Sequence, residues 1–155
     1  MKIIYIANAR IPTEKANGKQ IVKTCEALAK SGVSVELWLP NRKQPENIKN
    51  DLFKFYNLKR IFRVRKIPTI DFLIWARKMP KIFQVLAYLL QEISFDLVLA
   101  MQGYTSDAVY TRSITAAAIM KLFKGTRVFY EIHNITENRL AKIIHKSLWR
   151  QFDGL

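Results

Sequence analysis

The sequence contains few of the residues from which disulfides and metal centres are built. Among its 155 residues there are one cysteine, Cys25, and two histidines, His133 and His145. A single cysteine excludes a disulfide within the chain, and its place among apolar residues at helical spacing predicts a small buried side chain in a reducing compartment. Because these three residues are scattered along the chain, we expect no metal site.

Several motifs of nucleotide-binding and hydrolytic enzymes are also missing. The dinucleotide fingerprint G-x-G-x-x-G does not occur, and neither does the P-loop pattern G-x-x-x-x-G-K-[ST]. The G-x-S-x-G pattern of serine hydrolases is absent as well. A phosphate site in this protein must therefore be built in another way.

Acidic residues are scarce, and this scarcity sets the charge. Only 12 Asp and Glu oppose 26 Lys and Arg, which gives a formal net charge of +14. Such an excess favours nucleic acid, an anionic membrane surface or phosphorylated ligands as partners. Most of it lies between residues 42 and 81, where basic residues interleave with aromatic ones. The candidate patch for a membrane or another anion comprises Lys54, Lys59, Arg60, Arg63, Arg65 and Lys66.

No apolar run is long enough to be expected to span a membrane. Residues 72–90 are the most apolar long segment, but Arg77, Lys78, Pro80 and Lys81 interrupt it. The uninterrupted part, residues 82–90, is far shorter than the ~20 residues of a membrane span. The amino terminus begins like a strand rather than like a signal peptide. We therefore expect a cytoplasmic protein that does not cross a membrane.

What the sequence does contain is the pattern of an α/β domain, most clearly in residues 1–40. Residues 3–7 form an apolar run typical of a buried strand, Ile21, Cys25 and Leu28 recur at helical spacing, and residues 33–39 alternate as in a strand. A strand, a helix and a second strand open a doubly wound parallel sheet, which binds ligands beyond the carboxyl ends of its strands. The chain length fits one domain, since domains most often have about 100–150 residues.

The rest of the chain continues the α/β pattern. We expect a loop over residues 41–50, a helix over 72–93 that Pro80 kinks or splits, a helix over 114–123 stopped by Gly125, and a final helix from Glu137. Strands are expected over residues 61–67, 95–100 and 127–132, with 108–111 as a further candidate. Residues 152–155 resemble the start of the strand expected at 95–100, so we expect the chain to be a piece of a longer protein.

The loop at residues 8–18 carries the first group of candidate binding residues. It contains Arg10, Lys15, Asn17 and Gly18, and Lys19 follows directly. A helix amino terminus offers unpaired N–H groups and partial positive charge, and a glycine lets the backbone approach, so a phosphate or diphosphate would be held well there. The alternative is that Asn17 and Gly18 only cap the helix.

The ends of two later strands carry the second group. Glu131, His133 and Asn134 lie at the carboxyl end of the strand expected at 127–132, where His133 could bond a sugar hydroxyl or a phosphate oxygen. Arg112 ends another strand, on what should be the same edge of the sheet, and could meet an anion. The alternatives are a histidine held by strand-end hydrogen bonds and, for Arg112, a surface salt bridge.

These residues carry a resemblance to a known family. Residues 1–42, 55–58, 95–98, 109–113 and 129–134 resemble, in order and spacing, the amino-terminal domain of the retaining glycosyltransferases of family 4. These enzymes have the GT-B architecture of two facing Rossmann-like domains. The resemblance covers nearly the whole chain. It implies a Rossmann-like, doubly wound, mostly parallel sheet over residues 1–155 that is one half of a GT-B enzyme, with the donor-binding domain absent.

The resemblance also implies partners and roles. It implies a nucleotide-sugar as co-substrate with no other cofactor, a glycan or lipid-linked acceptor, and transfer with retention. Gly18, with Lys19, would lie at the donor diphosphate, although Asn17 stands where the family commonly has a second glycine. His133, the candidate catalytic residue, would contact the transferred sugar. The candidate acceptor-binding or sugar-binding residues are Arg10, Asn17, Arg112, Glu131 and Asn134.

Two consequences follow for activity and location. The donor-binding domain supplies most of the groups that stabilise the departing diphosphate, so the chain alone is expected to have little or no activity. Family members that act on lipid-linked acceptors dock on anionic membranes through this domain. The patch within residues 54–66 is therefore a candidate for docking at the inner face of a membrane.

Two other functions stay open at this point. A basic α/β module could bind nucleic acid through residues 54–66, with aromatic side chains stacking on bases and affinity falling steeply with salt. No known nucleic-acid motif accompanies this stretch. A non-catalytic subunit could instead pair with a separate donor-binding chain, which exposed apolar surface on the strand-end face would favour.

Overall fold

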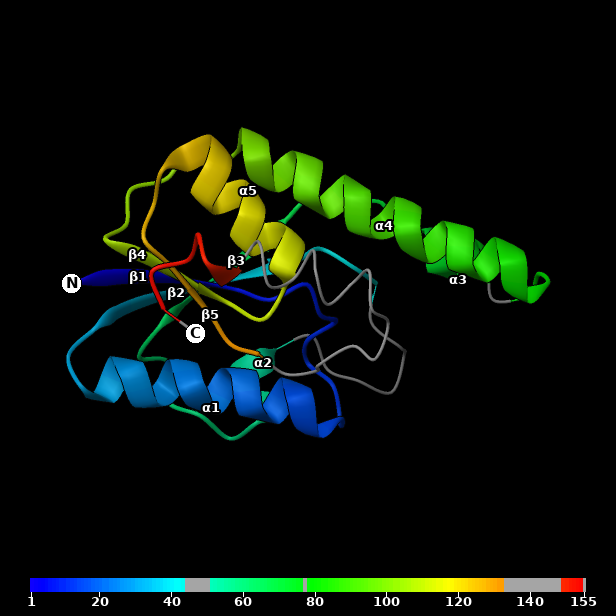
Figure 1. Ribbon diagram of the computed structural model, residues 1–155. Helices are drawn as coiled ribbons and strands as arrows, with labels where there is room; N and C mark the ends of the chain where they lie inside the picture. Colours follow the sequence, from blue (N-terminus) through cyan, green and yellow to red (C-terminus); the bar gives the residue numbers. More distant parts are fainter. Residues whose placement is uncertain (44–50, 77, 133–148, 155) are drawn as a thin grey trace.

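The computed structural model describes residues 1–43, 51–76, 78–132 and 149–154, and it contains a five-stranded, all-parallel sheet. The strand order is β3-β2-β1-β4-β5 (Figure 1). The strands are β1 (Lys2–Ile6), β2 (Ser34–Pro40), β3 (Arg63–Ile67), β4 (Ala108–Thr111) and β5 (Val128–Tyr130). This arrangement confirms the predicted fold class, a Rossmann-like, doubly wound α/β sheet.

Helices cover both faces of the sheet, as Figure 1 shows. They are α1 (Ala16–Lys30), α2 (Leu52–Phe55), α3 (Phe72–Ala76), α4 (Lys81–Met101) and α5 (Ile114–Lys124). In β1, Ile4 and Ile6 pack in the core under α4 and α5, whereas Tyr5 packs in the core under α1. Successive strand residues point to opposite faces, so a strand covered on both sides needs an unbroken apolar run. Residues 3–7 supply that run.

The strand order places a crevice beside the end of β1. This strand pairs with β2 on one side and with β4 on the other. The strands up to β3 are therefore added on one side of β1 and the later ones on the other side, so the strand order reverses at β1. In open α/β sheets, ligands bind outside the carboxyl ends of the strands at such a switch point. The segments that follow β1, β2 and β4 are therefore positioned to line a binding site.

Two helix boundaries follow the sequence signals closely. The side chain of Ser113 accepts a hydrogen bond from the Ala116 N–H and caps the start of α5. Gly125 ends the same helix in the left-handed conformation, with φ of 61°. Pro80 precedes α4 and separates it from α3, so the predicted split at this proline is confirmed.

The strand predicted over residues 95–100 is wrong, because these residues belong to α4. Phe95 and Leu99, four residues apart, are fully buried, whereas Leu97 between them is 62% exposed. Burial at a spacing of four is helical, whereas a strand would bury alternate residues. A short apolar run cannot be assigned by periodicity alone, since a buried strand and a buried helical turn look alike. The candidate strand at 108–111 is instead the central β4.

This correction changes the length of the apolar helix. With 21 residues, α4 continues well beyond Leu90, where the uninterrupted apolar segment was expected to end. Within the described part of the chain, it is the one helix long and apolar enough to cross a membrane, judged by length and composition only.

The end of the chain returns to the sheet. Gly154 forms a parallel bridge with Phe129 of β5, and the Asp153 side chain accepts a hydrogen bond from the Val128 N–H at 2.8 Å. These contacts are at the place where the sequence predicts a strand to begin. The helix predicted from Glu137 lies outside the described residues.

Candidate functional site

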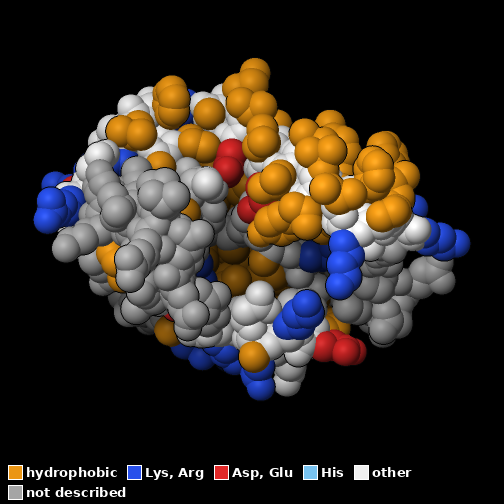
Figure 2. All heavy atoms as spheres, turned by 45° about the vertical axis from the view of Figure 1, so that its right-hand side comes forward, with side chains coloured by type: hydrophobic (Ala, Val, Ile, Leu, Met, Phe, Trp, Pro, Cys, Tyr) orange, Lys and Arg blue, Asp and Glu red, His pale blue; other side chains and the backbone are white. Residues whose placement is uncertain are grey.

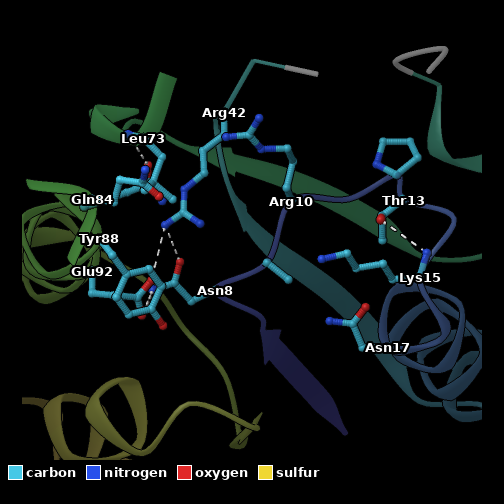
Figure 3. A pocket seen from close by; sticks show the side chains of 13 residues that line it. Asn8, Arg10, Thr13, Lys15, Asn17, Arg42, Leu73, Gln84, Tyr88 and Glu92 are labelled. Atoms are coloured by element: carbon cyan, nitrogen blue, oxygen red, sulfur yellow. Dashed lines mark hydrogen bonds and ion pairs between the residues drawn. The ribbon is translucent and has the colours of Figure 1, made fainter. Parts of the chain in front are cut away.

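A cleft of about 770 Å³ opens beyond the carboxyl ends of β1 and β2 (Figure 3). One wall is the segment between β1 and the start of α1, and the other is formed by α3 and α4. The lining residues are Asn8, Ala9, Arg10, Pro12, Thr13, Lys15, Asn17, Arg42, Leu73, Gln84, Tyr88, Gln91 and Glu92. Most of them are polar, and both carboxamides and charged groups are present.

Arg42 is the best-buried charged side chain of the cleft, with 6% exposure. It follows β2, donates a hydrogen bond to the Asn8 side chain at 2.6 Å and lies 3.6 Å from the Glu92 carboxylate. Asn8 in turn donates to Glu92 at 2.7 Å. The Nε of Arg42 is buried without a hydrogen-bond partner in the described structure. Asn8, Arg42 and Glu92 form what we call the Arg42 cluster.

Burial perturbs both charged members of the Arg42 cluster. It lowers the pKa of Arg42, an effect that the neighbouring Glu92 and Asp71 carboxylates oppose. It also raises the pKa of Glu92, which the positive charge of Arg42 opposes. Desolvation disfavours the charged form of each group, and mutual attraction restores it. The cluster therefore places an organised, partly dehydrated ion pair at the end of β1 and β2.

Arg10 lies in the same cleft and is paired. Its guanidinium donates to both oxygens of Asp71, at 2.9 and 2.8 Å, and the two side chains are 23% and 11% exposed. This bond ties the loop after β1 to the start of α3. A guanidinium has five N–H donors, so Arg10 keeps hydrogen-bonding capacity toward a ligand.

The start of α1 forms the opposite side of the cleft, where Figure 3 shows Lys15 and Asn17 across from Arg42. Lys15 precedes the helix and makes no side-chain capping bond. The Gly18 N–H donates to the Asn17 side chain at 2.8 Å, but both residues lie in the first turn of α1, after its N-cap Lys15, so they do not cap the helix as the alternative expected. Of the residues predicted in this loop, Arg10, Lys15 and Asn17 line the cleft, whereas the buried Gly18 and the exposed Lys19 are not part of its lining.

Gly18 has a packing reason for being glycine. A Cβ at this position would come within 2.6 Å of the Tyr56 hydroxyl and would also collide with the Thr13 side chain. That hydroxyl accepts a hydrogen bond from the Thr13 N–H at 2.9 Å and donates to the Thr13 carbonyl at 2.7 Å. The glycine thus lets α1 pack closely against the clamp between Tyr56 and Thr13. The proposed contact with a diphosphate is a separate matter, and it stays a prediction.

Arg112 and Glu131 meet each other at the ends of β4 and β5. Their side chains are 2.8 Å apart, and Glu131 also accepts a hydrogen bond from the Tyr110 hydroxyl at 3.0 Å. Burial, followed by this bond to the carboxylate, raises the pKa of Tyr110 to about 12. The structure therefore pairs Arg112 with a carboxylate, as its salt-bridge alternative expects. His133 and Asn134 lie outside the described residues.

The basic residues of the predicted anion patch differ in their surroundings. Arg65 is half-buried, and the other five are exposed: Lys54, Lys59, Arg60, Arg63 and Lys66. Arg60 pairs with Asp51 at 2.6 Å and lies over the ring of Phe53.

The other two basic side chains of the patch point in different directions. Arg65 stacks on Trp38, with its guanidinium carbon 4.8 Å from the ring centroid, and donates to Gln102 at 2.7 Å. Lys66 donates to the Ile11 carbonyl at 3.0 Å, and burial of its ammonium lowers its pKa. Half of the patch is thus engaged in contacts within the fold.

Several cleft residues were missed by the sequence reasoning. Asn8 and Arg42 could have been found, because each lies within three residues of the end of a predicted strand. Tyr88 and Glu92 could not have been found. The sequence predicts a helix over these residues, but nothing in it indicates that their side chains lie at the end of β1. Among the described residues, no group of three or more His, Cys, Asp or Glu side chains is placed to hold a metal ion.

Comparison with known proteins identifies the fold. No protein-family model and no curated protein match the chain. Among solved structures, it is similar to apo UGT2 of Phytolacca americana, with a TM-score of 0.53 over 87% of this chain and 16% sequence identity. The chain spans 30% of the length of that structure. Together with the parallel sheet, this likeness shows a glycosyltransferase-like fold of the kind that forms one half of a GT-B enzyme.

Proposed function

We propose that this chain is the acceptor-binding domain of a glycosyltransferase that takes a sugar from a nucleotide-sugar donor. The observation that carries the proposal is the cleft at the switch point of a glycosyltransferase-like fold, lined by the Arg42 cluster. Ligands bind at this place in open α/β sheets. The finer assignment, to family 4 and to transfer with retention, rests on the sequence resemblance.

The chemistry of the cleft suits a carbohydrate. The lining includes the carboxamides of Asn8, Asn17, Gln84 and Gln91, which offer hydrogen-bond donors and acceptors to hydroxyl groups. Tyr88 adds an aromatic ring, and the Arg42 cluster adds charged groups. Few polar groups at fixed positions are what give a small-molecule site its orientation and specificity.

In the reaction, an oxygen of the acceptor bonds to the anomeric carbon of the donor while the bond from that carbon to the diphosphate breaks. The acceptor hydroxyl gives its proton to the departing diphosphate in the same conversion. The task of this chain would be to hold the acceptor so that the hydroxyl faces the donor, since orientation alone can supply several kcal/mol. Glu92 and Asn8 are the groups that we assign to this positioning. His133 keeps its proposed contact with the transferred sugar.

The departing diphosphate needs positive groups or N–H donors around it. Here the start of α1, with Lys15 and Gly18, is the part of this chain that we assign to the diphosphate. The remaining contacts would come from a second, donor-binding domain or partner chain. We accordingly expect little or no transfer from the 155-residue chain alone.

The proposal can be tested by NMR on the 155-residue chain. Soluble glycosides are added to labelled protein, and we expect shifts of the side-chain amide signals of Asn8 and Gln84. The variant Glu92→Gln should weaken binding by about tenfold, because a hydrogen bond to a charged group contributes ~1.5–3 kcal/mol. The matched control is Glu14→Gln, an exposed carboxylate that is not part of the cleft lining. If no glycoside moves the cleft signals, or if both variants behave alike, the proposal is wrong.

Nucleic-acid binding has less support. The aromatic side chains that would stack on bases are used in the fold, because Phe53 and Phe62 are buried against each other with ring centroids 5.0 Å apart. Tyr56 holds Thr13. Phe55 is half-buried and packs against Tyr56, so residues 54–66 present no exposed aromatic ring of the kind on which single-stranded nucleic acid stacks.

A further inference from the structure

The outer side of α3 and α4 carries an unusual concentration of exposed apolar side chains. Figure 2 shows hydrophobic side chains gathered on this part of the molecule, next to a hollow in its surface. We define the α3–α4 surface by six of the side chains there that are at least half exposed: Trp75, Ile82, Phe83, Val85, Leu86 and Leu89. Ile82 and Trp75 are the most exposed of them, at 76% and 71%. Contiguous exposed apolar surface of this kind marks an interaction site.

The helix α4 is apolar on both sides. Its inner side supplies Ala87, Phe95 and Leu99 to the protein interior, all of them buried. A surface helix ordinarily directs polar residues outward, and a helix that is apolar all round is covered on all sides. Something other than water is therefore expected to cover the α3–α4 surface.

The charges around this surface indicate the chemistry of that partner. The two acids of α4 point away from it, because Glu92 belongs to the Arg42 cluster and Asp96 is buried. In the described residues from 72 to 101, the exposed charged side chains are Lys78 and Lys81, both positive. They stand where α4 begins. An apolar surface edged by lysines matches an anionic lipid bilayer, with acyl chains for the apolar part and headgroups for the lysines.

Aromatic residues with a polar atom agree with this assignment. Trp75, 71% exposed, is on α3, and Tyr88, 50% exposed, is on α4 at the edge where this surface meets the cleft that its ring also lines. Trp and Tyr are enriched where a membrane meets water, because one end of each ring is apolar and the other forms hydrogen bonds. A second copy of the chain is a poorer partner, because it brings the same net charge of +14 and the same lysines to the contact.

We propose that the α3–α4 surface docks on an anionic lipid bilayer, with α4 lying in the interface. The inner side of α4 explains why the helix would not cross the membrane. Phe95 and Leu99 are fully buried in one core cluster with Ile4 and Trp38, and Glu92 pairs with Arg42. Spanning would remove these side chains from the core, whereas lying flat keeps every inner contact.

Docking would place the cleft beside the lipid. Gln84, Tyr88 and Glu92 line the cleft from the same helix whose outer side is the α3–α4 surface. An acceptor carried on a lipid could then reach the cleft while its chain stays in the bilayer. This step rests on the proposed function, whereas the docking itself does not.

The first experiment measures binding of the full chain to lipid vesicles by flotation. Vesicles of phosphatidylglycerol mixed with phosphatidylcholine are compared with vesicles of phosphatidylcholine alone. We expect binding to the anionic vesicles that weakens with salt, and a loss of at least about tenfold for Ile82→Glu, because one apolar side chain leaves the bilayer. The matched control Leu122→Glu makes a comparable change at a leucine of α5 that is 62% exposed and lies outside both the α3–α4 surface and the basic patch, and it should keep most of the binding.

The second experiment asks whether the surface enters the bilayer. Phospholipids brominated in their acyl chains quench nearby tryptophan fluorescence, and Trp75 is the exposed tryptophan, since Trp38 is fully buried and Trp149 is partly buried. We expect quenching in the wild-type chain and its loss in Trp75→Phe, which still floats with the vesicles.

Four results would overturn the proposal. They are failure to bind anionic vesicles, equal binding by the two glutamate variants, binding without quenching, and retention of the protein in membranes after alkaline extraction, which would indicate a spanning helix. A dimer that Ile82→Glu dissociates, with no vesicle binding, would assign the surface to a second copy. The vesicles hold no glycan, so none of these results depends on the glycosyltransferase proposal.

Discussion

The two sides of the sheet are built differently, and α1 and α4 show how. Each helix closes one face of the same sheet with buried apolar residues. Outward, α1 presents polar side chains such as Lys23 and Lys30, which are exposed and pair with the Glu26 carboxylate at 2.8 Å and 3.1 Å. By contrast, α4 presents the α3–α4 surface. Both helices therefore complete the core equally well, and the difference between them concerns what each meets outside the molecule.

The largest effect is expected for the inner side of α4. Phe95→Ala should lower the free energy of unfolding by about 3–5 kcal/mol, because it removes a fully buried ring and leaves a cavity. Leu97→Ala, at a residue 62% exposed, should change it by no more than ~0.5 kcal/mol. Urea unfolding measures both. If the two variants are equally destabilised, residues 95 and 97 lie on the same buried face, as they would in a strand, and the assignment to α4 fails.

This pair of residues also shows what could be predicted from the sequence. Period and turn chemistry gave the parallel sheet, the split at Pro80 and the end of α5 at Gly125, because those signals are local. Residues 95–100 were assigned to a strand because a short apolar run has no unique period. The signal that was missing is the amphipathic pattern of an ordinary surface helix. It is absent here because the outer side of α4 is also apolar.

For the candidate site, the sequence predicted which loop would line it but not which side chains from distant segments would meet there. Arg10 and Asn17 were found because they lie in the loop after the first strand, and this loop does line the cleft. The pairing of Arg42 with Glu92 joins residues 50 positions apart, and no local pattern contains that contact. Likewise, the close packing of Gly18 against Tyr56 depends on a segment that folds back on the start of α1.

On the α1 side, the tightest point is Gly18. Gly18→Ala should lower the free energy of unfolding by about 1–3 kcal/mol, because the added methyl group must displace the Tyr56 hydroxyl and Thr13. Thermal and urea unfolding give the value. Gly103→Ala is the matched control, since a Cβ there meets no atom within 4 Å. In the double variant with Tyr56→Phe, the loss should be less than the sum of the single losses. Additive losses would contradict the packing account.

A smaller effect, of opposite sign, is expected at Asp96 on the α4 side. Burial raises the pKa of this carboxyl, an effect partly offset by a hydrogen bond with Thr115. The folded state then holds its proton more tightly than the unfolded state, so this group lowers stability as pH rises from its ordinary pKa of 3.8 through the raised value. Asp96→Asn should remove that dependence and stabilise the protein at pH 7 by about 1 kcal/mol. Unfolding measured between about pH 4 and pH 7 tests this. A variant with unchanged slope would show that Asp96 is ionised without penalty.

The smallest effect is the one that isolates the outer side of α4. Replacing Ile82 and Leu86 together by glutamine should change the free energy of unfolding by no more than ~0.5 kcal/mol, because both side chains are more than half exposed and little of the fold depends on them. Glutamine keeps a helix-forming, uncharged side chain, so the change is limited to apolar character. Chemical denaturation measures stability, and flotation with anionic vesicles measures docking. A loss above about 1 kcal/mol would mean that these residues pack within the fold. Unchanged stability with lost docking would show that the apolar residues on the outer side of α4 serve a partner rather than the core. In this variant the outer side of α4, like that of α1, would be polar and in contact with water.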